Sequence, residues 1–158
     1  MRTPRPVLSS PAVLGLLGLV AVSALAGRHF MFVRNARALT GVVFPGGLVR
    51  VEVAVSRAER EMGLAGRDSL PPDTGMLFVY PDTRQRRFTT EGMRFSLDIV
   101  SLSADGVVTG IMTRGPGEPG FHTAPARFVL EIPAGWAAAH GVTAGTRVLL
   151  QREGGTGP

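Results

Sequence analysis

Short apolar segments divided by glycine and proline most limit how this chain can fold. Residues 49–55, VRVEVAV, alternate apolar and polar side chains, the pattern of a strand with one buried face. Residues 76–80, MLFVY, predict a brief strand buried on both faces and ended by Pro81. Further strands are expected at 87–91, 97–103, 107–113, 127–132 and 146–151, with a hairpin turn at 104–106 and a long loop at 114–125.

Two short helices interrupt these strands. Ser56 is followed three residues later by Glu59, which makes a capping box, and Gly63 or Gly66 can end the helix that it starts. Residues 134–141, AGWAAAHG, predict a helical turn that ends at Gly141. We therefore expect a mostly β, small single domain at residues 38–152, either barrel-like or a compact sandwich, with a flexible tail at 153–158.

The N-terminal segment is expected to direct the chain to a membrane. No charged residue lies between Arg5 and Arg28, and residues 12–26 are almost wholly apolar. A cleaved signal peptide is one interpretation, because the ALA at 24–26 fits signal peptidase. A retained signal-anchor helix is the other, because the arginines that follow resist translocation. Both assign residues 1–37 to an apolar helix with basic flanks and predict export of the domain to the cell envelope or beyond.

The charge distribution argues against a nucleic-acid partner. The net charge is +5, but residues 1–37 contain five arginines and no acid, whereas residues 38–158 contain 12 arginines and all 12 acids. A nucleic-acid-binding domain carries its positive surplus on the folded body. The chain has no cysteine, which excludes disulfides, thiolate metal sites and a thiol nucleophile.

Three stretches carry a family resemblance. They are VEVAVSRAEREMGLAGRDSLPPDTGMLFVYPD, MRFSLDIVSLSADGVV and RFVLEIPAGWAAAHGV, within residues 49–150. In this order they resemble the domain-of-unknown-function family 192 of bacteria and archaea. The resemblance implies a small β-rich fold in an exported or membrane-associated setting, with no established reaction. Family members typically read F-W-M-K-N where this chain has residues 88–92, FTTEG, so a function that depends on those groups is lost or changed here.

Candidate catalytic residues are limited to one pair of acids. Glu91 and Asp98 could act as a general acid and base if one pKa were raised and the other carboxylate stayed ionised. The alternative is that one is solvated and the other is paired with Arg67, Arg87 or Arg94.

A wider set of residues has side chains suited to binding a ligand. One of them, Trp136, is expected first to pack its ring in the core with a partner for its N–H group, and stacking on a ligand is the lesser alternative. The set is Arg67, Thr89, Glu91, Asp98, His122 and Trp136. We expect no metal site, because two scattered histidines do not supply three or four ligands, and no cofactor.

Three functions remain open. The first is a non-catalytic, exported or membrane-tethered accessory or binding module, with a cleft between residues 86–95 and 114–125. Its partner would be a small molecule, a glycan or an envelope protein, and also the membrane if the leader is uncleaved. The second is an envelope hydrolase that uses Asp98 and Glu91. The third is a structural subunit of an envelope assembly, which requires a broad exposed apolar patch.

Overall fold

The computed structural model describes residues 25–154, in two compact units that meet between Arg34 and Asn35. A helix spans residues 25–37. Within 25–154, no helix is long and apolar enough to cross a membrane. The predicted signal peptide or anchor falls mainly on residues 1–24, which lie outside the described residues. It therefore stays a prediction.

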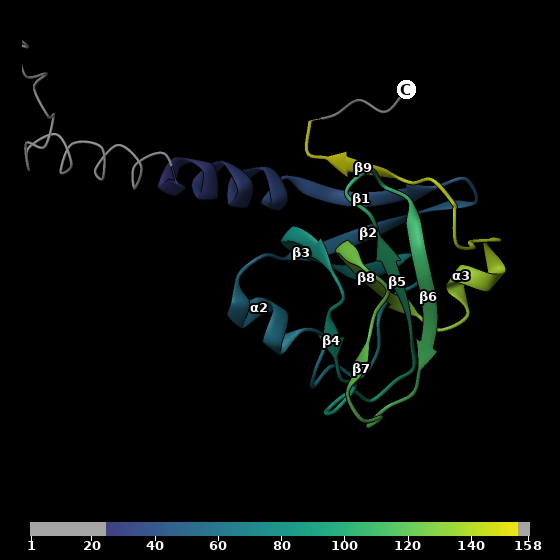
Figure 1. Ribbon diagram of the computed structural model, residues 1–158. Coiled ribbons are helices and arrows are strands. Elements are labelled where there is room, and N and C mark those ends of the chain that lie inside the picture. The colour runs from purple at the N-terminus through teal and green to yellow at the C-terminus, as the bar shows by residue number, and fades with distance from the viewer. Residues whose placement is uncertain (1–24, 155–158) are drawn as a thin grey trace, which may run out of the picture. The chain divides into compact units, whose positions relative to one another are not determined.

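The domain is built on one mixed sheet of seven strands in the order β6-β5-β8-β3-β2-β1-β9 (Figure 1). These strands are β1 (Leu39–Phe44), β2 (Gly47–Ala54), β3 (Thr74–Arg84), β5 (Leu97–Leu102), β6 (Val108–Arg114), β8 (Ala126–Pro133) and β9 (Leu149–Arg152). A small second sheet pairs β4 (Arg87–Phe88) with β7 (Phe121–His122). The helices of this unit are α2 (Arg57–Met62) and α3 (Trp136–Ala139).

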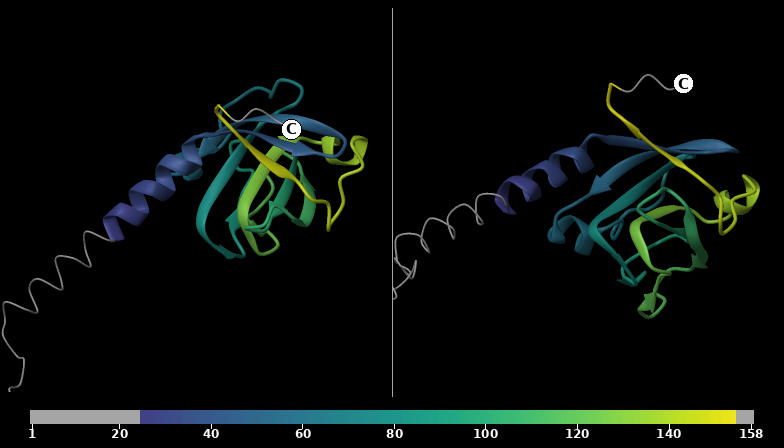
Figure 2. Two further views of the ribbon diagram at one scale, coloured as in Figure 1. Left: turned by 90° about the horizontal axis from the view of Figure 1, so that it is seen from above. Right: turned by 45° about the horizontal axis from the view of Figure 1, so that its top comes forward.

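The mostly β class is confirmed, but the prediction of a barrel-like fold is wrong. The sheet ends at β6 and β9, which do not pair with each other as strands. The segments beside them are joined by an isolated bridge between Val107 and Arg147 and by backbone hydrogen bonds between residues 106–108 and 145–148. Figure 2 shows the curvature of the sheet from two further directions. The helix α2 forms the crossover between β2 and β3, which makes them a parallel pair in an otherwise antiparallel sheet.

Several strand boundaries differ from those expected. Residues 39–44, for which no strand was predicted, form β1. The strand β3 continues through Pro81, because its ladder to β8 is interrupted between Val79 and Arg84 and needs no amide donor there. The strand β4 contains only two residues of the predicted 87–91 strand, and β7 lies inside the predicted long loop.

The predicted capping box at α2 is confirmed. The Ser56 side chain accepts from the Glu59 amide, and the Glu59 carboxylate accepts from the Ser56 amide at 2.7 Å. Glu59 also accepts from the Val55 amide and pairs with Arg37 at 2.7 Å. The Ser56 amide, then Arg37 and Val55, hold the pKa of this carboxyl at about 2. Glu59 therefore joins α2 to the segment that precedes β1.

The central strands β5, β8 and the first half of β3 are buried on both faces, as the apolar run at 76–80 predicts. Met76 and Phe78 point to one face and pack with Leu64, Ile99 and Val129. On the opposite face, Leu77 pairs with Leu130, which in turn pairs with Val100, and all three are fully buried. Hydrogen bonding to β5 attaches α3 to this opposite face. The sheet thus has an α2 side and an α3 side.

Candidate functional site

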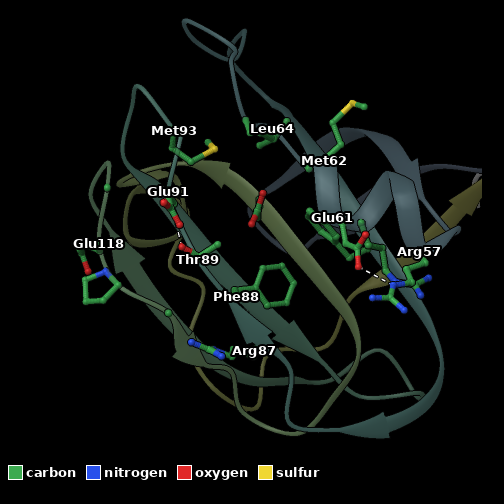
Figure 3. Close-up of a pocket in the computed structure, with 18 of the residues that line it drawn as sticks. Arg57, Glu61, Met62, Leu64, Arg87, Phe88, Thr89, Glu91, Met93 and Glu118 are labelled. Atoms are coloured by element: carbon green, nitrogen blue, oxygen red, sulfur yellow. Dashed lines mark hydrogen bonds and ion pairs between the residues drawn. The ribbon is translucent and has the colours of Figure 1, made fainter.

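A pocket of about 790 Å³ opens on the α2 side of the sheet. It is bordered by α2 and the turn after it, by β4 with the residues that follow, and by residues 117–120; we call it the α2–β4 pocket. Figure 3 shows Phe88 near its centre, Leu64 and Met93 at one end and the Arg57–Glu61 pair at the side. It lies between the two segments that the sequence analysis proposed as the edges of a cleft, and α2 adds a third border.

The sheet contributes Glu131 to this pocket. In the sheet Glu131 pairs with Met76 on one side and Ile99 on the other, so its side chain joins an apolar row. Glu131 is 5% exposed, and within the described part of the chain no hydrogen bond or salt bridge reaches its carboxyl group. Burial without such a partner raises its pKa to about 8. The group is therefore largely protonated at neutral pH.

Tyr80 also lines the pocket, and two guanidinium groups lie close to its ring. The Arg60 and Arg86 guanidinium carbons lie 4.8 Å and 4.0 Å from the centre of its ring. Burial raises the pKa of the Tyr80 hydroxyl, and the two arginines oppose that rise. Arg86 is itself paired with Asp82 at 2.5 Å. Tyr80 is thus held in place as a neutral polar group of the pocket.

Buried Thr90 fixes the edge formed by residues 117–120. Its hydroxyl donates to the Gly115 carbonyl at 2.6 Å and accepts from the Glu118 amide at 2.9 Å. The Gly117 amide donates to the Thr90 carbonyl at 2.9 Å. Phe88 packs edge-on against Phe78, with ring centres 5.1 Å apart. The polar edge and the aromatic wall are both positioned by residues of the 86–95 segment.

Two of the predicted site residues, Thr89 and Glu91, line the α2–β4 pocket. Both are exposed, and the Thr89 hydroxyl accepts from the Glu91 amide at 3.1 Å (Figure 3). They come to the rim because β4 ends at Phe88 and the chain then turns at Gly92, which has a positive φ of 76°.

The structure does not bring Glu91 and Asp98, the proposed catalytic pair, together. Asp98 lies on the α3 side of the sheet, where it is 2% exposed. Its carboxylate accepts hydrogen bonds from the Thr113 hydroxyl at 2.7 Å and from the Ala137 amide at 3.0 Å. Asp98 thus provides a hydrogen-bond acceptor for a backbone amide in the first turn of α3. Since the two carboxyl groups face opposite sides of the sheet, the hydrolase hypothesis built on them loses its premise. Of the three arginines expected as partners, Arg67 pairs with Glu52 and Arg94 pairs with Asp68 instead.

The remaining predicted binding residues lie outside the pocket lining. Arg67 holds Glu52 through two hydrogen bonds of 2.6 and 2.7 Å. His122 is exposed on β7. Trp136 is 8% exposed and donates its ring N–H to Asp73 at 2.8 Å, which is the packing role expected from the sequence. Within residues 25–154 no group of three or more metal-binding side chains was found.

The sequence analysis missed Glu131, Arg60 and Tyr80. Glu131 alternates with Leu130 and Ile132, which reads as one polar position on a half-solvated strand. The position is buried because β8 lies between β5 and β3 in the interior of the sheet. A signal was present, since a carboxyl group in a strand with two buried faces is costly unless a partner or a pocket receives it.

Comparisons with known proteins agree with this fold. Residues 42–150 match the family DUF192, described as "Uncharacterized ACR". A solved structure from Sinorhizobium meliloti 1021, described as a "putative transcription regulator", is 29% identical with a TM-score of 0.63 and covers 70% of this chain and 90% of its own. A protein of unknown function from Novosphingobium aromaticivorans DSM 12444 is 30% identical with a TM-score of 0.63, and the match covers 69% of this chain and 81% of that one. Among curated proteins, none matches this sequence. The chain belongs to the DUF192 family.

Proposed function

We propose that this protein is a non-catalytic binding module, exported or tethered to a membrane, that holds a small ligand in the α2–β4 pocket. The observation that carries the proposal is a pocket of about 790 Å³ that contains a buried carboxyl group to which no residue of the described range 25–154 forms a hydrogen bond or salt bridge. Small-molecule sites are commonly concave, about 300–1,000 Å³ in volume and apolar with a few placed polar groups. The apolar leader at residues 12–26 supports the exported setting.

A ligand screen with a pocket-blocking variant tests the binding function. In Thr89→Trp, an indole replaces a small exposed side chain at the pocket rim. Thr143→Trp is the matched control, because Thr143 is exposed and lies outside the pocket lining. A ligand of the pocket should raise the melting temperature of the wild type and of Thr143→Trp but not that of Thr89→Trp. Equal shifts in all three proteins, or no shift with any ligand class, would count against the proposal.

The exported setting has a separate test. A fusion of alkaline phosphatase to the C-terminus of the full chain should be active in bacterial cells, because that enzyme needs the oxidising environment outside the cytoplasm for its disulfides. Removing residues 1–26 from the fusion should abolish the activity. Activity that survives the deletion would refute export through this leader.

The assembly alternative has one observation in its favour. Leu48 and Leu149 are 40% and 64% exposed, and both pair with Val43 in the sheet, which makes a short apolar row across β2, β1 and β9. Replacing both leucines with serine should convert an oligomer to a monomer in analytical ultracentrifugation if this row is an assembly contact. One similar structure is described as a transcription regulator, but we do not propose DNA binding for this protein. Residues 38–158 carry as many acids as arginines, whereas a DNA-binding domain has a surplus of positive charge.

A further inference from the structure

Among the residues that the structure describes, none forms a hydrogen bond or salt bridge with the Glu131 carboxyl group. Its two neighbours in the sheet row are Met76 and Ile99, both apolar, and it lines the α2–β4 pocket. Buried carboxyl groups are normally supplied with a counter-ion or a hydrogen-bond donor. Since no described residue supplies one, a ligand in the pocket is the natural source of the partner.

The charges around Glu131 favour a cation in that role. Of the described residues, three arginines and three other glutamates line the pocket: Arg57, Arg60, Arg87, Glu61, Glu91 and Glu118. These six balance one another, so the lining gains one surplus negative charge when Glu131 ionises. A cationic ligand group would restore neutrality, whereas an anionic group would add a second negative charge beside the carboxylate.

Two of the three arginines that line the pocket are held by other parts of the chain. Arg57 is paired with Glu61 at 2.6 Å. Arg60 donates to the carbonyls of Val55 and Val79, and its guanidinium lies over the ring of Tyr80. Both guanidinium groups are thus engaged by other parts of the chain.

The walls suit an apolar body attached to the cation. Phe78 and Phe88 line the pocket together with Leu64 and Met93 (Figure 3). Aromatic ring faces attract cations, and the attraction grows when the cation is removed from water. The leucine and methionine side chains supply apolar surface for a hydrocarbon chain or ring.

We propose that the α2–β4 pocket binds an organic cation, an ammonium or guanidinium group on an apolar body, whose positively charged nitrogen pairs with the Glu131 carboxylate. This inference rests on the proposed binding function and specifies its ligand class. The rival partner is a neutral hydrogen-bond acceptor, to which the protonated carboxyl group would donate. The cation is favoured because hydrogen bonds with an ionised partner are about twice as strong as neutral ones.

The two partners predict opposite effects of pH. A cation binds the ionised form, so below the Glu131 pKa of about 8 its affinity should rise about tenfold per pH unit and then level off. A neutral acceptor binds the protonated form and should lose affinity above that pH. Tyr80 faces the same pocket, but burial raises its pKa, so it stays protonated over this range. His122 and His140 do not line the pocket.

The test compares four probes that share one hydrocarbon chain: hexylguanidinium, hexylammonium, hexanol and hexanoate. Their affinities for the full-length protein are measured by titration calorimetry from about pH 6 to about pH 8.5 at constant ionic strength. Both cations should bind more tightly than hexanol, and hexanoate should bind least. Glu131→Gln should weaken the cations by about 30-fold or more and remove the rise of affinity with pH. Glu153→Gln, an exposed glutamate outside the pocket lining, is the control for general charge effects.

The outcomes separate this inference from the function on which it rests. Binding of hexanol or hexanoate that Thr89→Trp blocks, without a preference for the cations, would overturn the ligand class and leave the binding function standing. Affinity of the cations that falls with pH, or that Glu131→Gln leaves unchanged, would also overturn it. If no probe binds and the wider ligand screen also finds no ligand, both the proposed ligand class and the proposed binding function are refuted. Thr89→Trp retains Glu131, so it gives a second measure of pocket binding if Glu131→Gln does not fold.

Discussion

Replacing Glu131 with glutamine should change how the stability of the protein depends on pH. The pKa of this buried carboxyl is about 8 in the folded protein, compared with an ordinary value of 4.5. Between these values the folded state holds a proton that the unfolded state has released, so the free energy of unfolding falls as pH rises. The stability is fully present below about pH 4.5 and is lost progressively up to about pH 8.

The magnitude follows from the width of that window. Each pH unit inside it costs about 1.4 kcal/mol, so from about pH 5.5 to about pH 7.5 the wild type should lose about 3 kcal/mol through this group. Glutamine has nearly the same shape and no charge, so Glu131→Gln should not show this loss. Urea denaturation at the two pH values measures both free energies.

Other ionisable groups contribute to any pH profile, so the comparison needs a control. Glu153→Gln alters an exposed glutamate and should keep the wild-type pH dependence. Glu59, with its pKa of about 2, releases its proton well below the chosen range and should affect neither measurement. If wild type and Glu131→Gln lose stability in parallel, to within about 0.5 kcal/mol, Glu131 is not the buried, unpartnered group described above.

Three further substitutions test the roles assigned to other residues. Ser56→Ala should destabilise the protein by about 1 kcal/mol in urea denaturation, since it removes the cap of α2; no change would show that the cap is dispensable. Asp98→Ala should cost about 1–3 kcal/mol because it leaves a buried amide of α3 unpaired, yet it should leave binding in the α2–β4 pocket intact, and a selective loss of ligand binding would restore Asp98 as a site residue. Trp136→Phe should lower the free energy of unfolding by about 2 kcal/mol, because it removes the hydrogen bond to Asp73. A double-mutant cycle with Asp73→Ala should assign this loss to the interaction between the two side chains.

Local patterns in the sequence were enough to locate most elements of the domain. The alternation at residues 49–55 predicts β2, and the spacing of Ser56 and Glu59 predicts the start of α2, because both features depend on residues a few positions apart. The apolar run at 76–80 correctly indicated a strand buried on both faces. The segments that border the pocket were also identified, because a polar strand and a Pro/Gly-rich loop stand out from the apolar strands around them.

The arrangement of those elements, and with it the candidate site, depended on pairing between residues far apart in the chain. The order of strands in the sheet decided that Asp98 faces α3 while Glu131 lies among apolar neighbours on the α2 side. A strand places successive side chains on opposite faces, but its sequence does not say what covers either face. The sequence alone therefore determined the β-rich class and the neutral charge of the domain. Only the tertiary structure decided that the sheet stays open and which carboxyl group is buried without a partner, because both depend on long-range packing.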